Sequence, residues 1–325
     1  MGNKKLTTGL LALSLLVTSS MALAKTVFIA SDVHPADYPT TAAVIHMGEK
    51  LSAQTDGRLA IKMFPNGQMG DEGATIEKAR AGAIDILRVS MAPVGGILPE
   101  VSVFNMPFVF RDLDHLHHVL DGQVGEQLGQ KVTDSNLGLV FLGWMDAGSR
   151  SLITKKPVNN LDDLKGVKIR LQNNPIGLDS FKAMGANPVV IPVGDVFASL
   201  QTGVIDAAEN NEPTFDTENY VVAGTKYFDM TEHFMIPEVF VFSKKKWAKL
   251  SAEDQALILK LAKEAQAEER VLWAQYVEKS TQKLQGQGVE FIKVDKKPFI
   301  DATAPVREKY GKQFSALMQQ IQETK

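Results

Sequence analysis

LKGVKIRLQNNPIGLDSFKAMGANPVVI (residues 164–191) and VFASLQTGVIDAAENNEP (residues 196–213) decide the fold of this chain. Each stretch combines short strand-like runs with a helical pattern. Arg170 places a fixed positive charge at the end of the run VKIR, and Asn210 opens an Asn-rich turn after the run IDAAEN. A cation and an amide at two strand ends are what a receptor for a carboxylated solute requires.

The same alternation of strand and helix patterns runs through the rest of the chain. It predicts an α/β protein with a mainly parallel sheet and helices on both faces. The pattern restarts after Arg150, which predicts a second α/β unit, and residues 234–242 resemble a strand that returns. We expect strands at residues 26–30, 59–64, 83–89, 137–144, 151–154, 167–170, 188–191 and 207–210, and helices at 38–55, 72–81, 115–122, 124–135, 175–184 and 194–202.

Residues 251–285 form one long amphipathic pattern that is rich in Ala and Glu. Ser251 is a good N-cap, and Glu253 and Asp254 follow in the first turn. A helix of this length is too long for one small domain, so we expect it to span two domains.

Composition excludes several classes of protein. The 325 residues are 44% hydrophobic and 22% charged, which is ordinary for a globular chain of one large or two medium domains. The net charge of −3 provides no overall basic field, so we expect no nucleic-acid partner. The chain has no Cys, which excludes a disulfide scaffold, a thiol nucleophile and a Cys-ligated metal.

The N-terminus has the pattern of a secretory signal peptide. Lys4 and Lys5 precede the apolar residues 10–17, and the small residues Ala22 and Ala24 make a cleavage site. The apolar run is shorter than a bilayer-spanning helix, which leaves a membrane anchor as the weaker alternative. We expect residues 1–24 to be removed and the mature chain to lie in the periplasm, without a lipid anchor because the cleavage site has no Cys.

Several stretches in a fixed order resemble one family of transport proteins. They are FPNGQMGDE, VFNMPFVFRD, GSRSLITKKPV, LKGVKIRLQNN and FASLQTGVIDAAEN, together with the exported N-terminus and the long late helix. This set resembles the DctP-type solute receptors of tripartite ATP-independent periplasmic (TRAP) transporters over almost the whole mature chain. The resemblance implies a two-domain periplasmic binding protein fold, with a cleft that closes on an organic acid and with the transporter's membrane subunits as partners.

The resemblance also implies domain boundaries and binding residues. Domain I would comprise residues 25–147 with about 236–275, and domain II residues 148–235 with about 276–325. Arg170 matches the Arg that pairs with the ligand carboxylate, Asn210 matches the Asn that orients it, and Arg150 matches a second Arg beside the ligand.

The chemistry of these side chains agrees with those roles. A guanidinium is always charged and offers a planar fork for both carboxylate oxygens, whereas Lys offers a point charge. Structural alternatives exist for each residue: Arg150 forms an interdomain salt bridge, and Asn210 is a turn residue. Arg170 caps a strand end or pairs with one of three acidic residues, Asp162, Asp163 or Asp179.

Further candidates are placed near the same cleft. Arg88 lies at the end of the run AIDILRV, and a cation at a strand end faces the mouth of an α/β sheet, where ligands bind. Two interpretations are open for Arg88: it determines the ligand subclass, or it is only a surface charge. Glu72 aligns with an acidic position of related receptors and would accept a ligand hydroxyl. Lower-ranked candidates are Asp32, His34, Gln172, Asn173, His233 and Glu238.

We expect neither a metal nor a cofactor. His115 and His118 would share a helix face, but no carboxylate at the i+4 position completes a ligand set. The chain lacks GxSxG, HExxH, P-loop and GxGxxG motifs. We therefore expect a binding protein, with a periplasmic lyase or hydrolase for sugar acids and a structural protein as the competing classes.

The candidate residues also narrow the ligand. Three Arg residues with Glu72, His34 and Asn side chains suit a ligand that has a carboxylate and several hydroxyls. The stretches SDVHPADYPT, ILRVSMAP and AENNEP resemble family members that take hexuronates such as glucuronate and galacturonate. A C4-dicarboxylate is the next alternative, followed by sialic acid or a 2-oxo acid.

Overall fold

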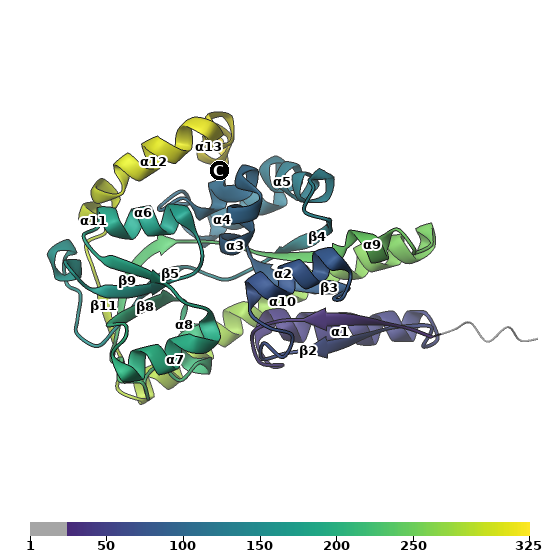
Figure 1. Ribbon diagram of the computed structural model, residues 1–325, viewed down its shortest axis with the longest axis horizontal. Coiled ribbons are helices and arrows are strands. Elements are labelled where there is room, and N and C mark those ends of the chain that lie inside the picture. The colour runs from purple at the N-terminus through teal and green to yellow at the C-terminus, as the bar shows by residue number, and fades with distance from the viewer. Residues whose placement is uncertain (1–24) are drawn as a thin grey trace, which may run out of the picture.

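Two β-sheets, each flanked by helices, form the two halves of the molecule (Figure 1). The computed structural model describes residues 25–325, so the signal-peptide prediction lies outside the described residues. No helix in this range is long and apolar enough to cross a membrane.

The first sheet has the strand order β2-β1-β3-β10-β4. Its strands are β1 (Thr26–Ser31), β2 (Leu59–Phe64), β3 (Ile86–Ser90), β4 (Leu139–Met145) and β10 (Glu238–Ser243). The helices of this half are α1 (Pro39–Gln54), α2 (Glu72–Ala81), α3 (Met91–Ile97), α4 (Leu113–Asp121), α5 (Gln123–Asp134) and α9 (Lys244–Trp247), with a 3-10 helix at Pro99–Asn105.

The second sheet has the order β11-β9-β5-β8-β6-β7. Its strands are β5 (Arg150–Thr154), β6 (Lys168–Leu171), β7 (Asn187–Val190), β8 (Ala207–Asn210), β9 (Tyr227–Phe234) and β11 (Glu290–Lys293). Its helices are α6 (Pro175–Ala183), α7 (Val193–Thr202) and α8 (Glu212–Thr217), with a 3-10 helix at Leu161–Leu164.

The chain crosses between the sheets along two adjacent paths. Residues 146–149 lead from β4 to β5, and residues 235–237 lead from β9 back to β10. The expected single strand over residues 234–242 is therefore wrong: β9 ends at Phe234, and a new strand begins at Glu238 after Pro237. Proline has no backbone N–H to donate to a sheet, which favours a break at this point.

The crossing strands also make both sheets mixed. β10 runs antiparallel to β3 and β4, and β5 runs antiparallel to β8 and β9. The other neighbouring strands pair in parallel. The expectation of a mainly parallel sheet is thus wrong for the strands that cross, because each enters its sheet from the opposite half.

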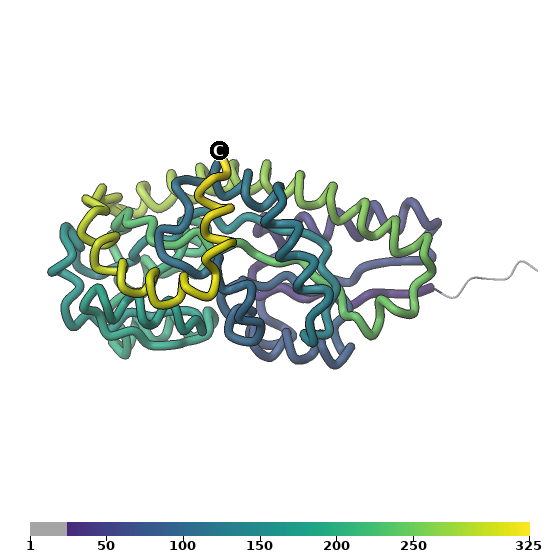
Figure 2. The backbone as a smooth tube through the Cα atoms, turned by 90° about the horizontal axis from the view of Figure 1, so that it is seen from above, coloured from purple at the N-terminus to yellow at the C-terminus, as the bar shows by residue number. Residues whose placement is uncertain are grey.

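Helix α10 (Ala252–Gly286) joins both halves, as the sequence pattern predicted. Its 35 residues make a rod of about 52 Å, which runs along one side of the molecule in Figure 2. Ser251 caps it by accepting a hydrogen bond from the Asp254 N–H at 3.1 Å. Ile258 and Leu261 pack in the core of the first half, and Leu284 packs in the core of the second.

The C-terminal segment touches both halves in turn. It comprises α11 (Lys297–Ala302), α12 (Ala304–Gly311), a 3-10 turn (Lys312–Phe314) and α13 (Ser315–Glu323). Helix α12 packs on α6, and α13 packs on α5, as the yellow segment of Figure 1 shows. Arg111 donates to the Thr324 carbonyl at 2.7 Å, which fixes the chain end to the first half. The domain boundaries stay a prediction.

Candidate functional site

A pocket of about 220 Å³ lies where the two halves meet. The start of α2 contributes one wall, and the segments after β6 and β7 contribute the other. Its lining residues are Asp71, Glu72, Gly73, Pro93, Arg170, Gln172, Asn173, Val190, Ile191, Pro192 and Val193. Four of the residues predicted from the sequence thus line one pocket: Glu72, Arg170, Gln172 and Asn173.

Arg170 presents an unused guanidinium fork at this pocket. Its Nε donates to the Ile191 carbonyl at 2.7 Å, whereas Nη1 and Nη2 have no hydrogen bond or ion pair within residues 25–325. The residue is only 3% exposed, and burial lowers the pKa of its guanidinium. A desolvated cation with free donors is costly unless an anion pairs with it. This geometry is therefore that of an anion-binding group.

The acidic residues offered as structural partners of Arg170 are engaged elsewhere. Asp179 pairs with Lys309 at 2.7 Å, and Asp162 pairs with Lys165 at 2.9 Å. Asp163 accepts the backbone N–H groups of residues 159 and 160. Arg170 is therefore not held by a carboxylate of its own segment.

Arg150 differs from Arg170 because its fork is already occupied. Its Nε and Nη2 donate to the two carboxylate oxygens of Glu209 at 2.6 and 2.8 Å, and Nη1 donates to Asn210 Oδ1 at 3.0 Å. Both partners belong to β8 of the same half, so the interdomain salt bridge considered for Arg150 is not formed. Burial raises the pKa of Glu209. The charge of Arg150, the nearby His233 and the hydrogen bonds from Arg150 outweigh this effect, and the pKa of Glu209 falls to about 2.

Glu209 is the residue that sequence reasoning missed. It is buried beside Arg150, and His233 Nε2 lies 3.5 Å from its Oε2. The acidic residue that directly precedes Asn210 in the run IDAAEN was the signal that could have identified it. Asn210 accepts from Arg150 and from the Asn211 N–H, so its oxygen serves the protein rather than a solute.

Arg88 lies inside the first half, buried among three carboxylates. Its guanidinium is 3.3 Å from Asp32 Oδ2, 3.5 Å from Glu72 Oε1 and 3.2 Å from Glu238 Oε2. Burial opposes the charge, but these carboxylates raise the pKa of Arg88 above its ordinary value. The surface-charge alternative for Arg88 is therefore wrong: it organises the acidic side of the site.

Two further contacts join the halves at the pocket. Gln172 Nε2 donates to Glu72 Oε2 at 3.2 Å, and Ser90 Oγ donates to Gln172 Oε1 at 3.4 Å. Asn173 lines the pocket but is exposed.

His34 is buried and stacks on Tyr38, with ring centroids 3.9 Å apart. Burial, followed by the charges of Arg88 and Arg150, lowers the pKa of His34 well below its usual value, so the ring is neutral.

The His-rich helix α4 has other partners. His115 Nδ1 accepts from the Arg111 N–H at 3.1 Å, and its Nε2 donates to the Ile321 carbonyl at 2.8 Å. His117 pairs with Asp146 at 2.7 Å. Within residues 25–325, no group of three or more His, Asp or Glu side chains is arranged to hold a metal ion.

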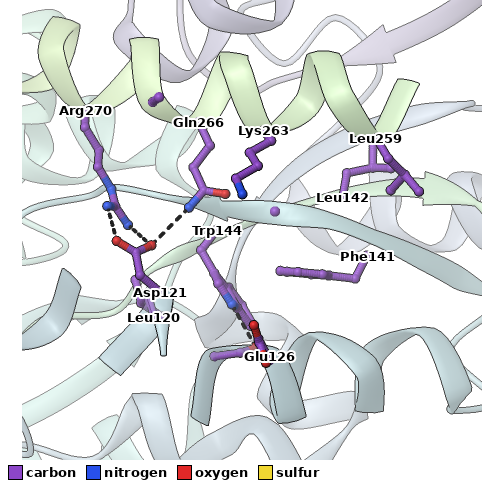
Figure 3. Close-up of a pocket in the computed structure, with 13 residues that line it drawn as sticks. Leu120, Asp121, Glu126, Phe141, Leu142, Trp144, Leu259, Lys263, Gln266 and Arg270 are labelled. Atoms are coloured by element: carbon purple, nitrogen blue, oxygen red, sulfur yellow. Dashed lines mark hydrogen bonds and ion pairs between the residues drawn. The ribbon is translucent and has the colours of Figure 1, made fainter. Parts of the chain in front are cut away.

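A larger cavity of about 510 Å³ lies between α10, β4, the end of α4 and the start of α5 (Figure 3). Arg270 forms a bidentate ion pair there with Asp121, at 2.6 and 2.8 Å, and Gln266 points to the same carboxylate. Arg270 is thus already neutralised, and the other cation of this cavity, Lys263, is exposed. Arg170 in the smaller pocket is the better anion site.

Comparisons with known proteins identify the family. The description "Bacterial extracellular solute-binding protein, family 7", named DctP, matches residues 30–313. A TRAP periplasmic solute-binding protein from Citrobacter koseri with bound D-glucuronate is 51% identical, with a TM-score of 0.91 over 92% of this chain and 100% of that chain. A complex from a Bradyrhizobium species with D-galacturonate is 42% identical, with a TM-score of 0.88 over 92% and 100% of the two chains.

The conformation can be compared as well. The apo, open structure of the Citrobacter koseri protein is 50% identical, with a TM-score of 0.82 over 91% of this chain and 98% of that chain. The present structure is therefore more similar to the ligand-bound form. These matches confirm the predicted two-domain fold and the resemblance seen in the sequence: the chain belongs to the DctP family of bacterial extracellular solute-binding proteins and is a solute receptor of the TRAP type.

Proposed function

We propose that this protein captures a hexuronate, such as D-glucuronate or D-galacturonate, and delivers it to the membrane subunits of a TRAP transporter. The observation that carries the proposal is the buried, unused fork of Arg170 in a pocket between the two halves. Similar proteins with bound D-glucuronate and D-galacturonate support the ligand class.

The two sides of the pocket suit the two chemical faces of such a ligand. Arg170, in the second half, would take both carboxylate oxygens in its fork. Glu72, in the first half, would accept hydrogen bonds from sugar hydroxyls. Arg150 and Asn210, which bind each other, would support the carboxylate side rather than supply a free fork. These residue roles are part of the proposal.

Ligand capture would be coupled to closure of the two halves. Arg170 and Glu72 belong to opposite halves, so a ligand that contacts both stabilises the closed form over the open form. The hydrogen bond between Gln172 and Glu72 also joins the two halves in this structure. The membrane subunits would then recognise the closed receptor.

We also infer that the protein works in the periplasm, after removal of residues 1–24, and that it is not an enzyme. The family is extracellular, and the leader pattern favours cleavage after Ala24. N-terminal sequencing of the exported protein should give Lys25 as the first residue. A first residue elsewhere would move the proposed cleavage site.

Ligand selectivity tests the proposed function. Calorimetric titrations should give D-glucuronate or D-galacturonate a lower Kd than glucose, which lacks the carboxylate, and than succinate, which lacks the hydroxyls. Each omission leaves buried polar groups unpaired, at about 1–3 kcal/mol for a neutral group and more for Arg170. If succinate or malate bound at least as tightly as both hexuronates, the dicarboxylate alternative would replace the proposal.

The ligand should leave the protein chemically unchanged. The sequence has none of the hydrolase, metalloprotease or nucleotide motifs sought above, and the family and its solved members are solute-binding proteins. Mass spectrometry of the hexuronate after prolonged incubation with the pure protein should show only the starting compound. A product that forms only when the protein is present would indicate an enzyme.

A further inference from the structure

Three buried arginines between the halves, Arg88, Arg150 and Arg170, form one group with four carboxylates. Of these carboxylates, Asp32, Glu209 and Glu238 are buried, and Glu72 is half-buried. The nearby His34 adds no positive charge, since it is neutral. One carboxylate is therefore in excess before any ligand arrives, and an anionic ligand adds another negative charge. Uncompensated buried charge is costly, so a proton is expected on one of the four.

Hydrogen bonding distinguishes the four carboxylates. Asp32 accepts from the His34 N–H and from Thr40 Oγ1, both at 3.0 Å. Glu72 accepts from the Ser90 N–H at 2.9 Å and from Gln172 at 3.2 Å, and Glu209 accepts two donors of Arg150. Donors of this kind favour the ionised form of a carboxyl. Each of these three carboxylates is therefore supported by at least two hydrogen bonds.

Glu238 lacks such support. It is 5% exposed, and its Oε2 is fully buried without a hydrogen bond from any residue of the described range 25–325. Its ion contact is with Arg88 Nη1 at 3.2 Å, a cation that Asp32 and Glu72 also share. The strand register holds it in place, because β10 begins at Glu238 opposite Ser90 of β3 and Met145 of β4. Among these four carboxyls, Glu238 is thus the one whose ionised form the protein supports least.

We propose that Glu238 carries a proton in the working receptor and that the receptor binds its anionic ligand in this protonated form. The inference rests on the proposed function and extends it to the charge state of the site. With Glu238 neutral, the three arginines balance three carboxylates, and the ligand is the one net charge added. Glu238 is a positioning residue in this scheme, because it acts through the charge of the Arg88 cluster.

The titration range agrees with this geometry. Burial raises the pKa of Glu238, Arg88 lowers it, and Glu72 and Asp32 raise it further, to about 8. By linkage, ligand affinity should be constant below this pH and should decrease above it, approaching about tenfold per pH unit. Charged and titratable groups of four elements surround Glu238. They are Asp32, His34 and Tyr38 at or before the start of α1, Glu72 on α2, Arg88 on β3 and Arg150 on β5.

The test is a set of D-glucuronate titrations from pH 6.5 to pH 9.5 on the wild type, Glu238→Gln and Glu72→Gln. Glutamine has the shape and charge of a protonated Glu, so Glu238→Gln should keep the neutral-pH affinity and lose the alkaline decrease. Glu72→Gln is the comparison variant: it should bind more weakly, and its decrease should begin at a lower pH, because Glu72 is one of the groups that raise the pKa of Glu238. A wild type with constant affinity, or a Glu238→Gln variant with the wild-type slope, would overturn the proposal.

Two measurements on the wild type keep the proposal testable if a variant does not fold. Near pH 8, calorimetry in buffers of different ionisation enthalpy should show proton uptake when D-glucuronate binds. In the ligand-free protein, the infrared C=O absorption of protonated carboxyls should lose one band as the pH rises through about 8, apart from the contribution of Glu269, another buried carboxyl with a raised pKa. The infrared result does not require a ligand. If the band is present but no hexuronate binds, the proposed function fails; if hexuronates bind but the band and the proton uptake are absent, the Glu238 proposal fails.

Discussion

Arg170→Ala is expected to weaken D-glucuronate binding by roughly 30- to several-thousand-fold, or about 2–5 kcal/mol. Two guanidinium nitrogens of Arg170 have no protein partner within the described chain, so a ligand carboxylate would be their main partner. The melting temperature of the ligand-free protein should change little, because the variant loses one hydrogen bond, to the Ile191 carbonyl, but also removes a desolvated cation. Calorimetry and thermal melting measure both quantities.

Two further variants control this experiment. Arg170→Lys keeps the charge but not the planar fork, so its affinity should fall by more than about tenfold. Arg270→Ala removes another guanidinium, one that pairs with Asp121 outside the pocket, and should leave the affinity unchanged. Wild-type affinity in Arg170→Lys would show that Arg170 is not the carboxylate anchor.

Glu209→Ala is expected to destabilise the protein by about 3–5 kcal/mol, because it leaves the Arg150 guanidinium buried without its carboxylate partner. Urea unfolding of the ligand-free protein measures this loss. The pKa of Glu209, near 2, is below its ordinary value, so its contribution is present above that ordinary value and is lost as pH falls toward about 2. The difference between wild type and Glu209→Ala should therefore shrink in acid.

A paired replacement separates the cost of a broken ion pair from the cost of lost volume. Arg150→Met combined with Glu209→Leu removes both charges and keeps apolar bulk, so it should recover much of the stability that Glu209→Ala loses. Asp179→Ala breaks the half-exposed ion pair with Lys309 and should cost less than about 1 kcal/mol. A Glu209→Ala protein as stable as the Asp179→Ala protein would contradict the predicted cost of the buried pair.

The sequence was sufficient for most of the secondary structure, because apolar periodicity is a local signal. The strand at residues 207–210 and the long helix were predicted closely. The error at residues 234–242 has a physical cause. The crossing residues 235 and 236 are buried and as apolar as the strands on either side, so periodicity alone could not separate two strands from one.

The site was only partly predictable for a different reason. Arg170 could be identified because its segment carries a recognisable motif. The state of each charge depends on partners far away in the sequence: Arg88 meets Asp32, Glu72 and Glu238. No local pattern specifies which carboxylate pairs with which arginine. The free fork of Arg170 and the occupied fork of Arg150 therefore became distinguishable only in three dimensions.

Helix α10 also constrains how the two halves can move, because it is packed into the core of each half near its two ends. Any change in angle between the halves must be absorbed by a bend in the helix or by slip at one of its two attachments. The attachments differ in strength: Ile258, Leu261 and Ala265 are embedded in one core, whereas Leu284 is the buried apolar anchor in the other. Slip at the Leu284 end would break fewer apolar contacts, so we expect the helix to shift at that end when the angle between the halves changes.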